Sequence, residues 1–391
     1  MARSSRSCRI WAHASIFEAL CLACGSDPTV ATGPTPEQEQ VATAIGSGDG
    51  SASSVTLTPV YVPKIARHAT ALGFNPAQPD ELWVTLRETA VDLPCTVTVS
   101  SGCDALAGKV AIVTGATGAA PDAQVTTDAN AWHFLRNPTS IAFAPSGLFA
   151  TCGEARTANY DDDALDYNGP VLWDPTIFGQ EPEPGQNGLH IDMLHDTPYC
   201  MGVAHERDNV YWVYNGDLGA LDRYDFKVPH PPGGEDHSDG ELLRYLEGEL
   251  LRVAGVPSHL DYDESTGSLY VADTGKSRVV RVNTKSGTAT DDIVTNDPIA
   301  VHQRVEGTHF DEVVSADQLQ SPSGLVLYQG VLFVTDNATS SVLAFTLEGK
   351  LLRRLDTGLP PGSLSGITIG PDGRAFLADL ATAEVFRVDL L

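Results

Sequence analysis

The chain has 391 residues, and its 24 Lys and Arg against 51 Asp and Glu give a formal net charge of −27 at pH 7. Nucleic acid and anionic bilayers bind proteins through Lys and Arg, so this acidic balance argues against both as partners. The apolar content of 42% argues against disorder throughout. The sequence has no apolar run of about 18 residues, which argues against a polytopic membrane protein.

The first 24 residues have the pattern of an export signal. Three arginines precede a short apolar stretch over residues 10–23, which is too short to span a bilayer. The tripeptide Leu22-Ala23-Cys24 resembles the cleavage box of bacterial lipoproteins, in which the cysteine is lipidated. We expect an exported protein of the cell envelope that meets a membrane only through this anchor. An ordinary secretory signal, with a periplasmic or extracellular product, is the alternative.

Residues 25–54 predict a flexible linker between the signal and the fold. They are rich in Gly, Ser, Thr, Pro and Ala and contain neither Lys nor Arg. Such a composition offers little apolar surface to bury, so we expect no packed structure before residue 55.

Four cysteines lie beyond the signal, an even number that suits an oxidising compartment and two disulfides. Cys95 and Cys103 flank the segment TVTVSSG and are placed to close a hairpin. Cys152 and Cys200 would then pair across a longer excursion of the chain.

One phrase recurs along the rest of the chain: a small residue, an alternating apolar stretch, a turn, and a second apolar strand that often ends in Asp. Each copy has the period-two pattern of a β-hairpin. The six copies span residues 69–85, 138–152, 199–215, 257–273, 322–336 and 364–379. Six repeats of short antiparallel strands predict an all-β, six-bladed β-propeller.

The ends of the chain favour closure of this ring. The last repeat has room for three strands only, and an unassigned strand over residues 54–62 precedes the first repeat. Pairing the two would complete the last blade and remove exposed edges, so we assign residues 55–391 to the propeller. Two acidic insertions, 153–198 and 216–256, read as long loops, where propellers usually carry function.

The repeated phrase resembles the NHL repeat, with the best copies at residues 257–283 and 322–346. The resemblance implies an NHL-type propeller fold. It does not by itself imply a chemistry.

Histidine is unevenly distributed, and neutral imidazole is the commonest metal ligand in proteins. Six of the eleven histidines fall within one stretch: His190, His195, His205, His230, His237 and His259. We predict a divalent metal of the zinc, copper or iron type at the mouth of the central channel. Its predicted ligands are His259, His195 and His237, with His205 as a further candidate.

The register of the repeats leaves a structural alternative for each of these residues. His259 stands where the other five repeats have a small residue at the start of the inner strand, so it is either a ligand or catalytic group or a channel-lining structural histidine. His205 lies in the apolar register, which suits a half-buried histidine between blades. His195 and His237 lie in loops, where the alternative is a solvated side chain.

Acidic residues accompany two of these histidines. Asp236 and Asp239 flank His237, and Asp261 and Asp263 alternate on the strand that follows His259. They could orient imidazoles or serve as oxygen ligands for calcium. The alternative is that they form Asx-turns.

The sequence PSHL at residues 257–260 resembles a His-bearing strand start of the peptidyl-hydroxyglycine amidating lyases, which are six-bladed NHL-type propellers with a catalytic zinc on three histidines. The resemblance implies His259 as a zinc ligand. The corresponding positions of the other repeats hold Ser, Gly or Ala, so further ligands would have to come from loop residues such as His195 and His237.

Two functions follow as hypotheses. The first is a monomeric, metal-dependent lyase or hydrolase that acts on a small polar substrate. The second is a non-catalytic cell-envelope scaffold that binds protein, peptide or glycan through its loop face.

Overall fold

The computed structural model describes residues 33–391 except 66, 89–94, 96–102, 104 and 163. Residues 34–391 form one compact unit. The predicted signal over residues 1–24 and the lipidation site Cys24 lie outside the described residues.

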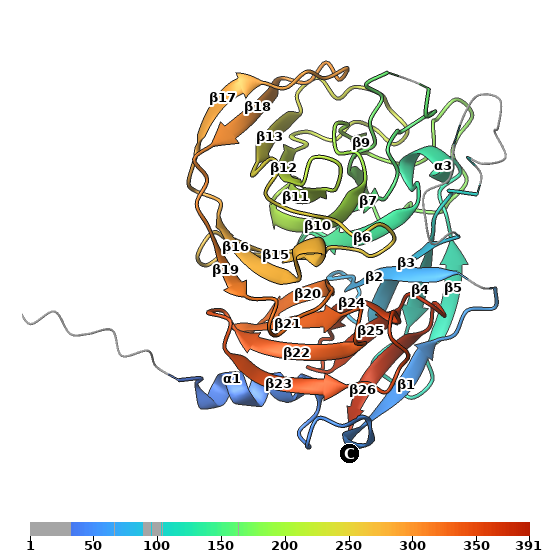
Figure 1. Ribbon diagram of the computed structural model, residues 1–391. Helices are drawn as coiled ribbons and strands as arrows, with labels where there is room; N and C mark the ends of the chain where they lie inside the picture. Colours follow the sequence, from blue (N-terminus) through green and yellow to red (C-terminus); the bar gives the residue numbers. More distant parts are fainter. Residues whose placement is uncertain (1–32, 66, 89–94, 96–102, 104, 163) are drawn as a thin grey trace, which may run out of the picture. The chain divides into compact units, whose positions relative to one another are not determined.

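Six sheets surround a central axis, which confirms the all-β, six-bladed propeller (Figure 1). Blades 1 to 3 contain, from the inner to the outer strand, β2 (His68–Phe74), β3 (Glu81–Arg87), β4 (Lys109–Thr114) and β5 (Asp122–Thr126); β6 (Pro138–Phe143), β7 (Phe149–Gly153), β8 (Val171–Trp173) and β9 (Asp192–Met193); and β10 (Cys200–Arg207), β11 (Val210–Asn215), β12 (Ala220–Asp225) and β13 (Glu241–Tyr245).

Blades 4 to 6 contain, in the same order, β14 (Leu260–Asp263), β15 (Ser268–Asp273), β16 (Arg278–Asn283) and β19 (Phe310–Val314); β20 (Pro322–Tyr328), β21 (Val331–Asp336), β22 (Ser341–Thr346) and β23 (Leu351–Asp356); and β24 (Leu364–Ile369), β25 (Ala375–Asp379), β26 (Val385–Leu390) and β1 (Val55–Tyr61). Each predicted hairpin forms the two inner strands of one blade. Each inner strand contacts the inner strands of both neighbouring blades, so the ring is closed.

The closing strand is the predicted one. β1 pairs antiparallel with β26, and Val55 lies opposite Leu390. The first strand of the propeller therefore completes the last blade and covers the edge that β26 would otherwise expose.

The inner strands pack so closely that several repeats need glycine at their start. A Cβ atom added to Gly202 would lie 2.2 Å from the carbonyl oxygen of Ser258, and one added to Gly324 would lie 2.2 Å from that of Ser365. This close approach explains why most copies of the repeat carry a small residue there.

Blade 3 is larger than the repeats predict. A hairpin of β17 (Thr288–Asp292) and β18 (Val301–Glu306) leaves blade 4 between β16 and β19 and joins blade 3. β18 runs parallel to β13, with Glu241 opposite Val301, which makes a six-stranded sheet.

The segment before β1 differs from the predicted flexible linker. Residues Pro36–Val41 form helix α1, whose N-cap Thr35 makes a capping box with Gln38. Two 3₁₀ helices follow, η1 (Ala42–Ile45) and η2 (Ala52–Ser54). Ala42 and Ile45 are buried among apolar residues of blades 5 and 6. A few well-placed apolar side chains therefore order residues 36–54, although their composition is typical of a linker.

The structure forms both predicted disulfides, Cys95–Cys103 and Cys152–Cys200. The second joins β7 of blade 2 to β10 of blade 3. Two further short helices are α3 (Ala131–Phe134) and η3 (Thr274–Lys276). Among the described residues, no helix has the length and apolar character needed to cross a bilayer.

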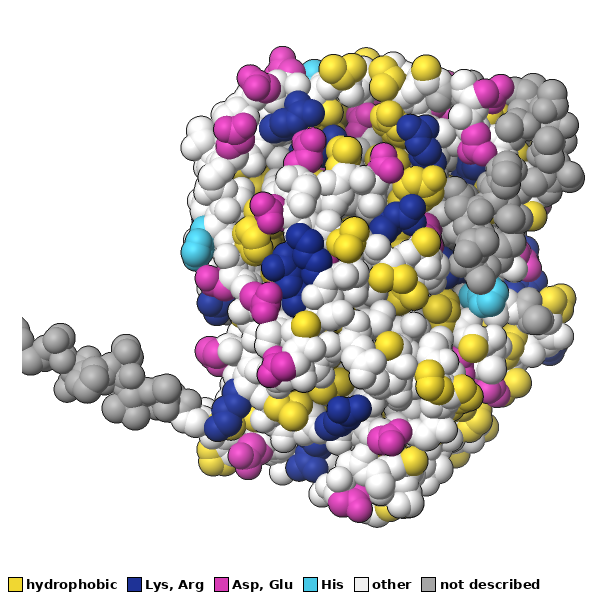
Figure 2. Space-filling model, in the orientation of Figure 1, with side chains coloured by type: hydrophobic (Ala, Val, Ile, Leu, Met, Phe, Trp, Pro, Cys, Tyr) yellow, Lys and Arg dark blue, Asp and Glu magenta, His cyan; other side chains and the backbone are white. Residues whose placement is uncertain are grey.

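The negative charge is not gathered in one area of the face shown in Figure 2. Asp and Glu side chains are scattered over that face, with Lys and Arg between them. A candidate site therefore has to be found from local geometry and not from a single charged surface.

Candidate functional site

Asp192, His230 and His237 form a compact group of metal-binding side chains. Each offers one ligand atom, and these atoms lie within 4.8 Å of one another. Asp192 belongs to β9, the outer strand of blade 2, whereas both histidines belong to the loop between β12 and β13 of blade 3. It is the only group of three or more His, Cys, Asp and Glu side chains with this geometry in the part of the chain that the structure describes.

Asp192 has one satisfied and one unsatisfied carboxylate oxygen. Its Oδ1 accepts hydrogen bonds from His237 Nδ1 at 2.9 Å and from the backbone N–H of Met193 at 2.8 Å. Its Oδ2 is buried and has no hydrogen-bond partner among the described residues. Burial raises the pKa of this carboxyl group, and the hydrogen bond from His237 opposes that shift.

His230, in the same group, has a nitrogen lone pair that no described residue uses. Its Nδ1 lies 2.8 Å from the carbonyl oxygen of Pro231 and must carry the proton, because a carbonyl oxygen can only accept. In the neutral ring Nε2 is then an acceptor. That atom is buried and has no hydrogen-bond partner among the described residues.

His190 lies next to this group and is held in the neutral form. Its ring stacks on Phe134 at 3.7 Å between centroids, and the His230 ring lies 5.0 Å away. Burial, followed by the nearby His230 and His237, lowers the pKa of His190 to about 3. Its Nδ1 donates to the carbonyl oxygen of Asn187 at 3.2 Å, which again leaves Nε2 as the acceptor.

Main-chain hydrogen bonds hold the two loops together around the group. The N–H of Gly233 donates to the carbonyl oxygen of His190 at 2.8 Å. Gln186 Nε2 donates to the carbonyl oxygen of Pro232 at 3.1 Å. The loop that precedes β9 and the loop that precedes β13 therefore form one packed unit across blades 2 and 3.

The structure does not bring the four predicted ligands together. Only His237 belongs to the group with Asp192 and His230. His195 lies elsewhere, with Nδ1 3.7 Å from an Asp166 carboxylate oxygen. His205 and His259 line a different cavity, on the axis of the ring.

The separation has a simple geometric cause. Adjacent strands of a sheet lie about 4.8 Å apart, so the inner and outer strands of one blade are about 14 Å apart. His259 precedes an inner strand, whereas His237 bonds to an outer strand. One signal in the sequence could have identified Asp192 as the partner of His237. His190 and Asp192 are alternate residues, and alternate residues of an extended segment lie on one face.

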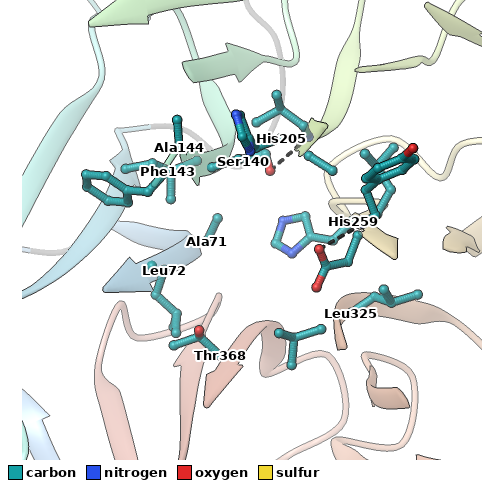
Figure 3. A pocket seen from close by; sticks show the side chains of 18 of the residues that line it. Ala71, Leu72, Ser140, Phe143, Ala144, His205, His259, Leu325 and Thr368 are labelled. Carbon is teal, nitrogen blue, oxygen red and sulfur yellow. Dashed lines mark hydrogen bonds between the residues drawn. The ribbon is translucent and has the colours of Figure 1, made fainter. Parts of the chain in front are cut away.

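The cavity that His205 and His259 line lies at the centre of the ring and has a volume of about 480 Å³. Residues of all six inner strands line it, and Figure 3 shows His259 in the middle of this circle of side chains. We call it the central funnel.

His259 links two blades that are not neighbours in the ring. Its Nε2 donates to the carbonyl oxygen of Thr139 at 3.0 Å, so it joins blade 4 to blade 2. The residue is only 6% exposed, and burial lowers the pKa of its imidazole to about 4. His205, also on the funnel wall, donates from Nε2 to the carbonyl oxygen of Asp208 at 3.0 Å.

Comparison with protein-family models and with curated proteins finds no match. The NHL and lipoprotein resemblances therefore stay predictions. Solved structures match the fold. One is a protein of unknown function from Bacteroides thetaiotaomicron, with 10% identity and a TM-score of 0.51 over 89% of this chain and 75% of that chain. Another is an auxiliary nutrient binding protein from Bacteroides ovatus, with 10% identity and a TM-score of 0.50 over 85% and 76%. At these identities the likeness shows the fold alone.

Proposed function

We propose that this protein is a metal-binding β-propeller that holds one divalent transition-metal ion at Asp192, His230 and His237. The observation that carries the proposal is a pair of buried atoms that have no hydrogen-bond partners among the described residues, Asp192 Oδ2 and His230 Nε2. Leaving such a group unsatisfied costs about 1–3 kcal/mol, and a metal ion between the two atoms would remove both penalties.

The chemistry of the ligand set favours zinc. Two imidazoles and one carboxylate are ordinary zinc ligands, and neutral imidazole suits a borderline-soft ion. At His237 the ion would replace the proton between Nδ1 and Asp192 Oδ1, which are 2.9 Å apart. The Nδ1–H of His230 donates to the carbonyl oxygen of Pro231. Hydrogen bonds of this kind orient metal-bound imidazoles and increase their basicity.

Burial favours a structural role for this ion. Asp192 is 1% exposed and His230 is 8% exposed. A catalytic metal needs an open position that substrate can reach, whereas a structural metal is enclosed by its ligands. The ion would fasten the β12–β13 loop of blade 3 to the outer strand of blade 2. Lyase or hydrolase chemistry at a metal stays a prediction of the sequence.

Metal analysis of the purified full chain tests this proposal. After loading with zinc chloride and removal of free metal, we expect close to one zinc ion per chain by mass spectrometry. His230→Ala, His237→Ala and Asp192→Asn should each lose most of this zinc. His195→Ala is the matched control, because its side chain is 17% exposed against 15% for His237 and lies outside the group.

Two results would contradict the proposal. One is a wild-type protein that retains no zinc after loading. The other is a His230→Ala protein that is folded by circular dichroism and still retains the wild-type amount. Removal of zinc with EDTA should also lower the melting temperature of the wild type and leave that of His230→Ala unchanged.

We also propose that the protein is exported, which the two disulfides support, because such bonds persist in oxidising compartments. The finer form of this proposal is a lipid anchor at Cys24, which rests on the Leu22-Ala23-Cys24 pattern. Cell fractionation tests it: Cys24→Ser should move the protein from the membrane fraction to the soluble fraction, and an unchanged distribution would contradict the anchor.

A further inference from the structure

The central funnel combines an apolar wall with a small set of hydrogen-bond acceptors. Its apolar side chains come from several blades and include Leu72, Ile141, Phe143 and Leu325. Its volume of about 480 Å³ lies in the range of small-molecule sites. It is separate from the Asp192 group, none of whose residues lines it.

His259 contributes an acceptor that no described residue uses. Because Nε2 donates to the carbonyl oxygen of Thr139, the neutral ring carries its lone pair on Nδ1. No described residue forms a hydrogen bond with Nδ1, although His259 is buried and only 6% exposed. In Figure 3 the imidazole reaches into the open centre of the funnel.

Asp261 contributes a carboxylate without a cationic partner. Its Oδ2 accepts from the backbone N–H of Leu327 and its Oδ1 from that of Tyr262, both at 2.8 Å. No Lys, Arg or His among the described residues forms a salt bridge with it. Burial raises its pKa to about 6, so the group is mostly ionised at neutral pH.

The other charged groups of the funnel do not balance Asp261. No Lys or Arg belongs to the described lining residues, which include the further carboxylates Glu206 and Glu264. Glu206 is already paired with Arg223 at 2.7 Å. The funnel therefore keeps a net negative charge in a partly enclosed space, where the field of a charge is focused.

We propose that the central funnel binds a small organic cation through its protonated amine. The ammonium group would donate to the Asp261 carboxylate and to His259 Nδ1, and its carbon skeleton would lie against the apolar wall. An ammonium group has three donors and no acceptor, which complements the acceptors that Asp261 and His259 offer. The charge of the amine would also pair the unpaired carboxylate.

Titration calorimetry with three matched probes tests this inference. The probes are 2-phenylethylamine, the neutral 2-phenylethanol and the anionic 3-phenylpropanoate. We expect the amine to bind to the full chain at least about tenfold more tightly than the alcohol, because a charged hydrogen bond in such a site is worth more than a neutral one. The carboxylate should not bind.

Two variants locate the site. Asp261→Asn should weaken amine binding about tenfold or more, since it removes the charge and keeps the side-chain volume. Asp263→Asn is the control, because the Asp263 carboxylate accepts from Ser265 and Thr266 in the turn and does not line the funnel. Thr368→Trp, on the blade 6 side of the funnel, should exclude the probe while leaving Asp261 intact.

The inference is overturned if the amine binds no better than the alcohol, or if folded Asp261→Asn and Thr368→Trp proteins both bind it like the wild type. His230→Ala should bind the amine like the wild type. The inference about the funnel therefore stands or falls separately from the proposed metal site.

Discussion

His259 illustrates how one residue can differ from its repeat for a structural reason. Five copies of the repeat have Ala, Ser or Gly where this copy has an imidazole. The side chain bonds to Thr139 of blade 2 and lines the funnel. Of the two interpretations of this position, the channel-lining histidine is therefore the one that its observed contacts support.

The buried imidazole predicts a dependence of stability on pH. The pKa of His259 is about 4 in the folded chain against an ordinary value of 6.5. As the pH falls below 6.5 the unfolded chain takes up a proton first, so this contribution is complete above that pH and declines towards pH 4. The loss at pH 5 amounts to about 2 kcal/mol for this one group.

His259→Gln tests this prediction, because an amide can still donate to Thr139 and does not titrate. Urea unfolding of both proteins at pH 7.5 and pH 5 is the measurement. The decrease in unfolding free energy between the two pH values should be about 2 kcal/mol smaller in the variant. Equal decreases would show that the pKa of His259 is not lowered in the folded chain. The comparison of two proteins cancels the opposite contribution of Asp261, whose raised pKa stabilises the folded chain as the pH falls.

At the scale of elements, the β17–β18 hairpin is the part of the fold that departs furthest from the repeat pattern. β17 is exposed and β18 is mostly half-buried, yet Ile293 and Ile299 between them are buried in the apolar cluster of blades 2 and 3. The hairpin is therefore attached through both its loop and the parallel pairing of β18 with β13. We expect it to contribute to the stability of blade 3.

Two adjacent residues of this hairpin allow a matched test. Ile293 is 4% exposed and Val294 is 74% exposed. Ile293→Ala should lower the unfolding free energy by about 2–4 kcal/mol through lost packing and the cavity left behind. Val294→Ala should change it by less than about 0.5 kcal/mol. Similar values for both variants in chemical denaturation would mean that the hairpin is not packed as described.

At the scale of the whole molecule, polar contacts between blades complement the closing strand. Hydroxyl groups near the start of four inner strands donate to carbonyl oxygens of a neighbouring blade: Thr70 to Pro138, Thr139 to Cys200, Ser323 to Pro257 and Ser365 to Ala69. These bonds recur because the blades repeat, and they satisfy main-chain groups that the close approach of the strands buries.

A buried ion network joins the blades at the end of the channel opposite the funnel. Arg87 is the last residue of β3 and lies opposite His68, at the end of the blade away from the funnel. Its Nη1 lies 3.1 Å from Glu154 of blade 2. Arg252, in the loop between blades 3 and 4, lies 2.6 Å from the other oxygen of Glu154. The Arg87 side chain is 0% exposed and that of Glu154 is 2% exposed.

Glu154→Ala should therefore be strongly destabilising. It leaves the Arg87 charge buried without its carboxylate, and breaking a buried pair in this way costs about 3–5 kcal/mol. Glu247→Ala is the matched control: Glu247 lies 3.0 Å from Arg304, but both side chains are about 40% exposed. An exposed pair contributes less than about 1 kcal/mol. Comparable shifts of the urea midpoint in the two variants would contradict this role for Glu154.

The fold could be predicted from the sequence because its signals are local. Period-two alternation and turn residues define each hairpin within about 15 residues, and counting the hairpins yields the number of blades. The strand at residues 54–62 and the short last repeat were enough to predict the closure. The disulfides followed from an even number of cysteines and the short spacing of one pair.

The candidate site could be predicted only in part, because it depends on the paths of loops. Residues with no alternating apolar pattern are not assigned a position by periodicity. Asp192 and His237 are 45 residues apart and meet through hydrogen bonds between two insertions. The burial of η1 residues and the parallel pairing of β18 with β13 also depend on tertiary contacts that periodicity does not predict. The sequence by itself determined the ring of six blades, whereas tertiary packing decided which histidines meet, because only packing determines how nonperiodic segments lie on that ring.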